Sequence, residues 1–137
     1  MQVFLPYPDF ATSTACLDPK RLGNQIYREC KTLILGGWAN HPCSKMWAKY
    51  HTALAQYALC GLDELARRGK FYPHHIDFYT RWTYNSDVVM PHWLGHEQFH
   101  SAHRSILLAK NFDWYSKFGW VEKPAQMIDG KFPYIWF

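Results

Sequence analysis

The chain has 137 residues, the size of one domain, and its 48% apolar and 19% charged residues exclude a disordered protein. No apolar run reaches the roughly 18 residues of a membrane-spanning helix, and the start lacks the features of a secretory signal. The net charge of +4 does not by itself indicate nucleic-acid binding. We therefore expect one domain over residues 1–137, in the cytoplasm, monomeric and without membrane contact.

The N-terminal half is expected to hold two long helices. Residues 1–16 form an extended, turn-rich lead in this interpretation. A first helix is predicted from about Asp18 to Leu35, because Pro19 suits a first helical turn and Gly36-Gly37 suits a helix end. Its core face is marked by apolar residues at helical spacing, Leu22, Ile26, Cys30 and Leu33. A second helix is predicted from about Ser44 to Arg68, with an inner face of Met46, Tyr50, Ala53, Leu54 and Tyr57.

The C-terminal half is expected to hold one more long helix. A short helix is predicted around His75–Trp82, and a third main helix from about Leu94 to Lys110, with Phe99, Ile106 and Leu107 inward. The tail from Phe112 contains nine aromatic residues in 26 and is expected to be irregular, with one helical turn. No segment alternates as a strand does. The fold class is therefore all-α, a compact single domain of three main helices with an extended N-terminal lead and an aromatic-rich C-terminal tail.

The four cysteines favour reduced core thiols over a zinc site. Cys16, Cys30, Cys43 and Cys60 contain no closely spaced pair, which zinc fingers and ribbons need. Thiols in the core also agree with a cytoplasmic setting.

The positive charge is concentrated in one third of the chain. The net charge is +5 between Pro19 and Leu62 and about −1 elsewhere. A local positive patch suits a phosphate backbone, although solvated helix faces would explain the same charges.

Glu29 is the candidate acid in the first helix. It forms a row with Arg21 and Gln25 at a spacing of four residues, beside the apolar face. Burial would raise the pKa of this carboxyl and the nearby Arg21 and Arg28 would lower it, so Glu29 could stay ionised and still exchange protons. The alternative is a structural ion pair at the helix edge.

The segment His96-Glu97-Gln98-Phe99-His100 matches the H-E-x-x-H pattern of zinc peptidases, and His103 continues the same face. A zinc peptidase is not favoured, because no sheet is predicted that could hold a peptide substrate, and we expect no metal here. A metal-dependent hydrolase using His96, His100 and His103 remains the alternative. Otherwise these histidines and Arg104 face phosphates or pack structurally. In the tail, Trp114 and Lys117 could meet unpaired bases and a phosphate, or belong to the core.

Together these segments resemble the pyrimidine-dimer DNA glycosylase family, the phage-type endonuclease V group, and above all its bacterial and phage relatives. The resemblance covers almost the whole chain. It rests on Gln2–Pro8, Leu17-Asp18, Lys20–Gly23, Gly37-Trp38, Asn40–Pro42, Met46-Trp47, Pro91–Gly95, Phe99-His100, His103–Ser105 and Pro133–Trp136. A fainter resemblance to the best-studied phage enzyme rests on Tyr27–Glu29 and Trp114–Gly119.

The resemblance implies an all-helical protein that bends damaged double-stranded DNA, flips a base and uses a free amine without a cofactor. The amine attacks C1′ of the sugar, the base is released, a Schiff base forms and β-elimination cuts the strand, which is AP-lyase activity. The substrate would be a cyclobutane pyrimidine dimer or another altered pyrimidine. The alternative is a DNA-binding relative that has lost catalysis.

The resemblance also implies roles for individual residues. The catalytic set is Glu29, Met1, Gln2, Arg21 and Arg28. Gln2 is bulky enough to leave Met1 in place, so the attacking amine belongs to Met1, with Lys20 as the alternative. An α-amine is about 10–15% unprotonated at pH 7 and an ordinary lysine about 0.04%. Alignment through Arg21-Leu22 places Arg28 at the position of the family's acid, and a shift of one residue places Glu29 there. The DNA-binding set is Lys20, Asn24, Gln25, His41, His100, His103, Arg104, Lys110, Trp114 and Lys117.

Overall fold

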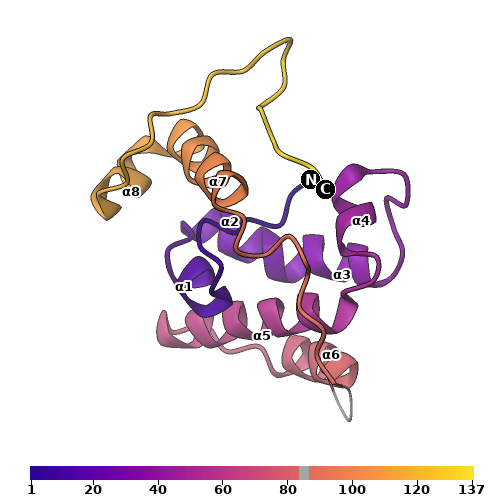
Figure 1. The fold of residues 1–137 in the computed structure, drawn as a ribbon. Coiled ribbons are helices and arrows are strands. Elements are labelled where there is room, and N and C mark those ends of the chain that lie inside the picture. The colour runs from indigo at the N-terminus through magenta and orange to yellow at the C-terminus, as the bar shows by residue number, and fades with distance from the viewer. Residues whose placement is uncertain (84–86) are drawn as a thin grey trace.

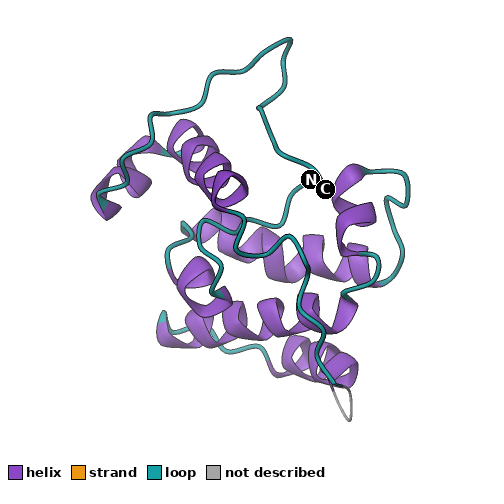
Figure 2. Ribbon diagram, in the orientation of Figure 1, coloured by secondary structure: helices purple, strands orange, loops and turns teal. Residues whose placement is uncertain are grey.

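The computed structural model describes residues 1–83 and 87–137, and these residues fold as helices joined by loops (Figure 2). The β pairing in this part of the chain is a single bridge between Ile128 and Lys131. The prediction of an all-α fold is therefore confirmed. None of the described helices has both the length and the apolar character needed to cross a membrane.

The described residues hold more α-helices than the three main ones predicted. In chain order the elements are α1 (Phe10–Ala15), α2 (Pro19–Asn24), the π-helical segment η1 (Gln25–Glu29), α3 (Cys30–Ile34), α4 (Pro42–Trp47), α5 (His51–Arg67), α6 (Pro73–Thr83), α7 (Glu97–Lys110), α8 (Phe112–Tyr115) and the 3₁₀ turn η2 (Ser116–Phe118). Figure 1 shows α5 running beneath the other N-terminal helices, with α7 and α8 at the opposite side.

The predicted first helix is one helical run from α2 through η1 to α3, in which only η1 is π-helical. Its predicted core face is buried as expected. Gly61 of α5 lies directly against this face, and a Cβ atom there would clash with Cδ1 of Ile26. The missing side chain thus lets α5 pack closely on η1.

Three of the predicted boundaries are corrected. The lead 1–16 contains α1, because the Asp9 carboxylate caps it by accepting the Thr12 amide at 2.8 Å. The predicted helix 44–68 is two helices, since the chain turns at residues 48–50 between α4 and α5. The third main helix begins at Glu97 and not at Leu94, because Gly95 has a φ of +92° that an α-helix does not allow.

The predictions of a short helix, of one helical turn in the tail and of free thiols agree with the structure. The helix predicted at His75–Trp82 is α6, which is slightly longer, and the tail carries one short helix, α8, followed by η2. All four cysteines are free thiols, three of them buried and Cys60 half-buried. Burial raises the pKa of the Cys43 thiol to about 12, so this thiol stays protonated.

Both ends of the chain meet at one place. The C-terminal tail leaves α8, loops over the molecule and returns, so that the two termini lie together in Figure 1. The ring centroids of Trp136 and His41 lie 5.7 Å apart, and those of Tyr134 and Phe4 lie 6.5 Å apart. The first residues of the chain are therefore enclosed by the tail.

Candidate active site

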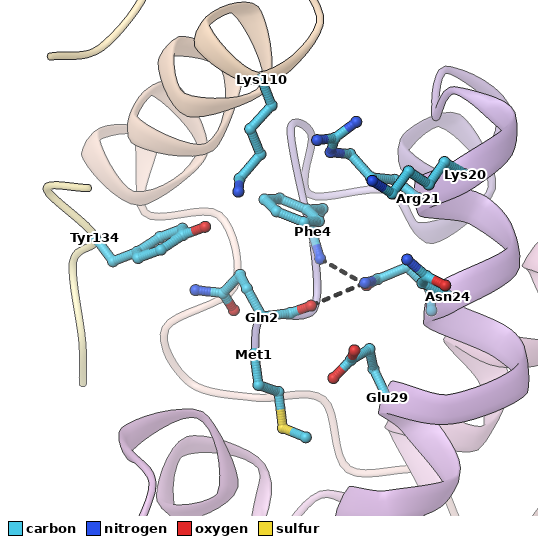
Figure 3. A pocket seen from close by; sticks show the side chains of 10 residues that line it. Met1, Gln2, Phe4, Lys20, Arg21, Asn24, Glu29, Lys110 and Tyr134 are labelled. Atoms are coloured by element: carbon cyan, nitrogen blue, oxygen red, sulfur yellow. Dashed lines mark hydrogen bonds between the residues drawn. The ribbon is translucent and has the colours of Figure 1, made fainter. Parts of the chain in front are cut away.

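The N-terminal segment Gln2–Leu5 is buried, yet within residues 1–83 and 87–137 it pairs with no strand. Side chains take over the backbone hydrogen bonds that a sheet would supply. The amide of Gln25 donates to the Gln2 carbonyl at 2.8 Å and accepts from the Phe4 amide at 2.9 Å (dashed lines in Figure 3). The hydroxyl of Tyr57 donates to the Phe4 carbonyl at 2.7 Å. This network fixes the position at which the chain begins.

Two histidines of α7 hold the next residue, Leu5. Its amide donates to Nδ1 of His103 at 2.9 Å, and its carbonyl accepts from Nδ1 of His100 at 2.8 Å. The second ring nitrogen of His100 accepts from the Gly95 amide at 2.9 Å, which assigns the proton of His100 to Nδ1. Burial lowers the pKa of His103 to about 3, so its ring is neutral.

These contacts change the interpretation of the H-E-x-x-H pattern. His100 and His103 are fully buried, so the structure presents neither ring to DNA, contrary to the predicted interface. Both ring nitrogens of His100 are already used, which leaves no lone pair for a cation. Glu97 pairs with Arg104 instead of activating a metal-bound water. His100, the middle one of the three proposed ligands, is therefore not available to a metal ion, which argues against the metal-dependent hydrolase.

A π turn decides which residue of the first helix faces the site. The Cys30 amide donates to the Gln25 carbonyl five residues earlier, so one extra residue is absorbed between Arg21 and Glu29. In a regular α-helix, residues eight apart differ by about 80°, whereas residues seven apart differ by about 20°. The extra residue thus brings Glu29 onto the face of Arg21.

Burial agrees with this placement. The Glu29 side chain is 9% exposed, and that of Arg28 is 68% exposed. Arg28 covers the carboxylate from the solvent side, with its Nη2 atom 2.9 Å from Oε1 of Glu29. The ion pair that the sequence offered as an alternative therefore exists, but the carboxylate also lines two pockets.

One pocket, called the main pocket below because Glu29 and the cations Lys20, Arg21 and Lys110 all line it, has a volume of about 240 Å³ and lies between α2, η1, α7 and the tail (Figure 3). It is lined by Met1, Gln2, Phe4, Lys20, Arg21, Asn24, Gln25, Glu29, Lys110 and Tyr134. A second pocket of about 230 Å³ is lined by Met1, Arg28, Glu29, Thr32 and Trp38. A third, of about 430 Å³, is lined by Met1, His41, Pro42, Lys131, Phe132, Tyr134 and Trp136. Met1 is common to all three.

Cations from two helices converge on the main pocket. Lys20 and Arg21 come from α2 and Lys110 from α7. Burial lowers the pKa of Lys110, and the charges of Arg21 and Lys20 lower it further. Arg21 is partly compensated by Asp18, at 3.2 Å. The cluster would be stabilised by an anion such as a phosphate.

His41 lies on the other side of Met1. Its Nδ1 accepts the Cys43 amide at 3.0 Å and so caps α4. Burial lowers the pKa of His41, the charge of the N-terminal amine lowers it further, and the charge of Glu29 acts in the opposite direction. The amine and the Glu29 carboxylate therefore act on the same histidine.

Three other predicted DNA-binding residues lie outside these pockets. The guanidinium of Arg104 is occupied by Glu122, at 2.9 Å, and by the Pro6 carbonyl, at 2.7 Å. The indole of Trp114 donates to the Cys16 carbonyl at 2.8 Å, and the Lys117 ammonium lies 3.5 Å from its ring centroid. Arg104 is thus engaged within the protein, and the Lys117 ammonium covers the Trp114 ring.

Sequence reasoning assigned no role to several residues that line the pockets. Phe4, Trp38, Tyr134 and Trp136 fall in segments that carry the resemblance, but aromatic residues at no regular spacing give no signal for a site. The return of the tail to the N-terminus brings Tyr134 and Trp136 there, and a sequence pattern does not encode that contact.

A comparison with known protein families identifies a matching family. The profile of a family described as pyrimidine dimer DNA glycosylase matches residues 1–80. No curated protein and no solved structure matches the chain. The matched part contains Met1, Lys20, Arg21, Glu29 and His41, whereas α7 and the tail lie beyond it.

Proposed function

Because the chain belongs to the pyrimidine dimer DNA glycosylase family, we propose that it excises a damaged pyrimidine from double-stranded DNA with the α-amine of Met1 as nucleophile. One observation carries the proposal. Side-chain hydrogen bonds hold Gln2 and Phe4, and Met1 beside them lines three pockets, two of which the Glu29 side chain also lines. Schiff-base chemistry uses an amine and a carboxylate at one site, and Met1 and Glu29 line two pockets in common.

The reaction begins with attack of the unprotonated amine on C1′ of the damaged nucleotide. The nitrogen lone pair forms the new bond as the bond from C1′ to the base breaks, and the base leaves with that electron pair and takes up a proton. Loss of a proton from nitrogen and opening of the bond between C1′ and O4′ give the Schiff base. Removal of a C2′ proton then expels the 3′ phosphate and cuts the strand, and water releases the amine.

Glu29 is proposed to move the protons. As a carboxylate it stabilises the positive charge that develops on the sugar, and it accepts the proton that the amine loses. It then returns that proton to O4′ as the ring opens. The Arg28 guanidinium lies 2.9 Å from the carboxylate and pairs with it between these steps.

The DNA backbone is proposed to lie over the cations of the main pocket. Lys20, Arg21 and Lys110 would neutralise phosphates on either side of the damaged nucleotide, and binding would weaken as the salt concentration rises. Flipping a base out of the duplex costs a few kcal/mol, and a distorted lesion lowers that cost. The preference for a pyrimidine dimer would come from this difference.

Trapping with borohydride tests the proposal. The protein is incubated with a duplex carrying one cyclobutane thymine dimer, reduced, and analysed by gel and by peptide mass spectrometry. We expect a covalent adduct on the Met1 peptide and none after acetylation of the α-amine. An adduct on the Lys20 peptide would overturn the assignment of the nucleophile. An adduct only with an abasic duplex would keep the lyase chemistry and reject the dimer as substrate.

A catalytically inactive DNA-binding relative is the second candidate, favoured by the positive cluster alone. It would bind DNA with the same dependence on salt but give no adduct with either duplex.

A further inference from the structure

The peptide groups of Leu5 are held in an unusual way. One histidine of α7 accepts its amide proton and another donates to its carbonyl, as a neighbouring β-strand would do. His100 and His103 are one helical turn apart, so α7 presents both rings to the same residue. Both rings are fully buried, and neither belongs to the segment that matches the family profile.

The burial of His103 in this arrangement costs stability. The Nδ1 atom of His103 accepts a hydrogen bond, so its proton lies on Nε2, and that buried N–H has no partner in the described part of the chain. A buried donor without a partner destabilises the fold, whereas an apolar residue of similar volume would remove it but leave the buried Leu5 amide without its acceptor. A retained unsatisfied group in a native core calls for a specific role.

The role that we assign to the two histidines follows from the position of Leu5 in the chain. Met1 is four residues from Leu5, about 13 Å along an extended backbone, and Gln25 holds the chain between them. The segment has no turn between these two points. The two histidines and Gln25 therefore hold successive residues of the same segment that leads to the amine.

We propose that His100 and His103 are positioning residues of the N-terminal amine: they fix Leu5 and thereby set where the α-amine of Met1 lies in the main pocket. The H-E-x-x-H pattern is then part of a clamp on the N-terminal segment. The clamp gives α7 a function at a site whose other residues come mostly from the N-terminal half. Its catalytic value rests on the proposed function, because a reacting amine must lie about 3–3.5 Å from C1′ and an error near 1 Å costs about 100-fold in rate.

Substitution of His103 tests the clamp. His103→Leu keeps the volume and removes the acceptor, and His103→Asn places an amide oxygen where Nδ1 was. We expect the single-turnover rate of adduct formation on an abasic duplex to fall about 100-fold in the leucine variant and to recover largely in the asparagine variant. The dissociation constant for the duplex should stay within about threefold, because the phosphate contacts are untouched.

Controls separate positioning from loss of stability. Ile106→Val alters a buried residue of α7 that the clamp does not use, and it should lower the melting temperature without lowering the rate. Should the leucine variant fail to fold, His103→Gln replaces it, since its amide reaches the Nε2 position and not Nδ1. The clamp is refuted if the leucine or glutamine variant keeps the wild-type rate, or if Ile106→Val loses as much rate at equal loss of stability.

A second measurement does not depend on catalysis. The α-amine is dimethylated with ¹³C-formaldehyde and a reductant, and its resonance is compared with that of a free Met-Gln-Val-Phe peptide. We expect a distinct resonance in the wild type and in His103→Asn, and a peptide-like one in His103→Leu. Equal resonances in all variants would reject the clamp. If the wild type forms no adduct with any duplex but these shifts differ as expected, the proposed function fails and the clamp stands.

Discussion

The amide of Cys30 donates its hydrogen bond to the carbonyl of Gln25, five residues earlier, in the middle of an otherwise α-helical run. This one π turn rotates the helical residues before it relative to the helical residues after it. As a result Glu29 faces the pocket and Arg28 covers it from outside. On this geometry we expect Glu29, and not Arg28, to take the position of the acid.

Glu29→Gln removes the proposed proton carrier and keeps the shape of the side chain. We expect base release to fall by about 10²–10⁴-fold, the usual contribution of a positioned acid or base, with little change in DNA affinity. Single-turnover base release and a binding titration measure the two effects. Glu64→Gln serves as the control, because Glu64 pairs with Arg67 and Arg68 away from the pockets. A glutamine variant that releases base normally would show that another group moves the protons.

Deletion of Tyr27 should be tolerated, which is unusual for a deletion within a helix. Without this residue, Arg21 and Glu29 would stay on one face of a regular α-helix, because their spacing becomes seven. We expect the melting temperature to fall by no more than about 5 °C, through loss of the contacts of Tyr27 with Tyr72 and His75. Deletion of Gln56 in α5 is the comparison: it turns the rest of that helix by about 100° and should unfold the protein. Thermal unfolding followed by circular dichroism distinguishes the two cases.

Lys110→Gln tests the cation cluster of the main pocket. If Lys110 neutralises one phosphate, the slope of log affinity against log salt concentration should fall by about 0.9. Lys123→Gln changes an exposed lysine at a different pocket and should leave the slope nearly unchanged. Binding titrations at several salt concentrations provide the measurement. An unchanged slope for Lys110→Gln would place this lysine outside the DNA interface.

His103 should make the protein sensitive to acid. Its pKa is about 3 in the folded protein and near 6.5 when unfolded, so the unfolded chain binds one more proton between these values. Stability is then complete above pH 6.5 and is lost as the pH falls toward 3, by up to about 5 kcal/mol from this residue. Urea unfolding of the wild type and His103→Asn at pH 7, 5 and 4 should show a smaller loss in the variant. If wild type and variant lost equal stability, His103 would take up its proton without unfolding of the protein, and the prediction would be wrong.

Local patterns determined the helical character of this chain. The apolar spacing of Leu22, Ile26, Cys30 and Leu33 predicted the core face of the first helix, because that spacing follows from helical geometry alone. It also placed Arg21 and Glu29 beside that face. The family resemblance implied roles for the cations Lys20 and Lys110, and the structure brings both to one pocket.

Tertiary structure decided the features that depend on contacts between distant residues. A π turn leaves no clear trace in apolar periodicity, so the register of Glu29 could not be chosen from sequence. His100 and His103 carry the same pattern whether they bind a metal, meet DNA or hold a backbone, and only the path of Leu5 past α7 decides among these. The return of the tail to Met1 is a contact across the whole chain, set by packing that no local pattern encodes.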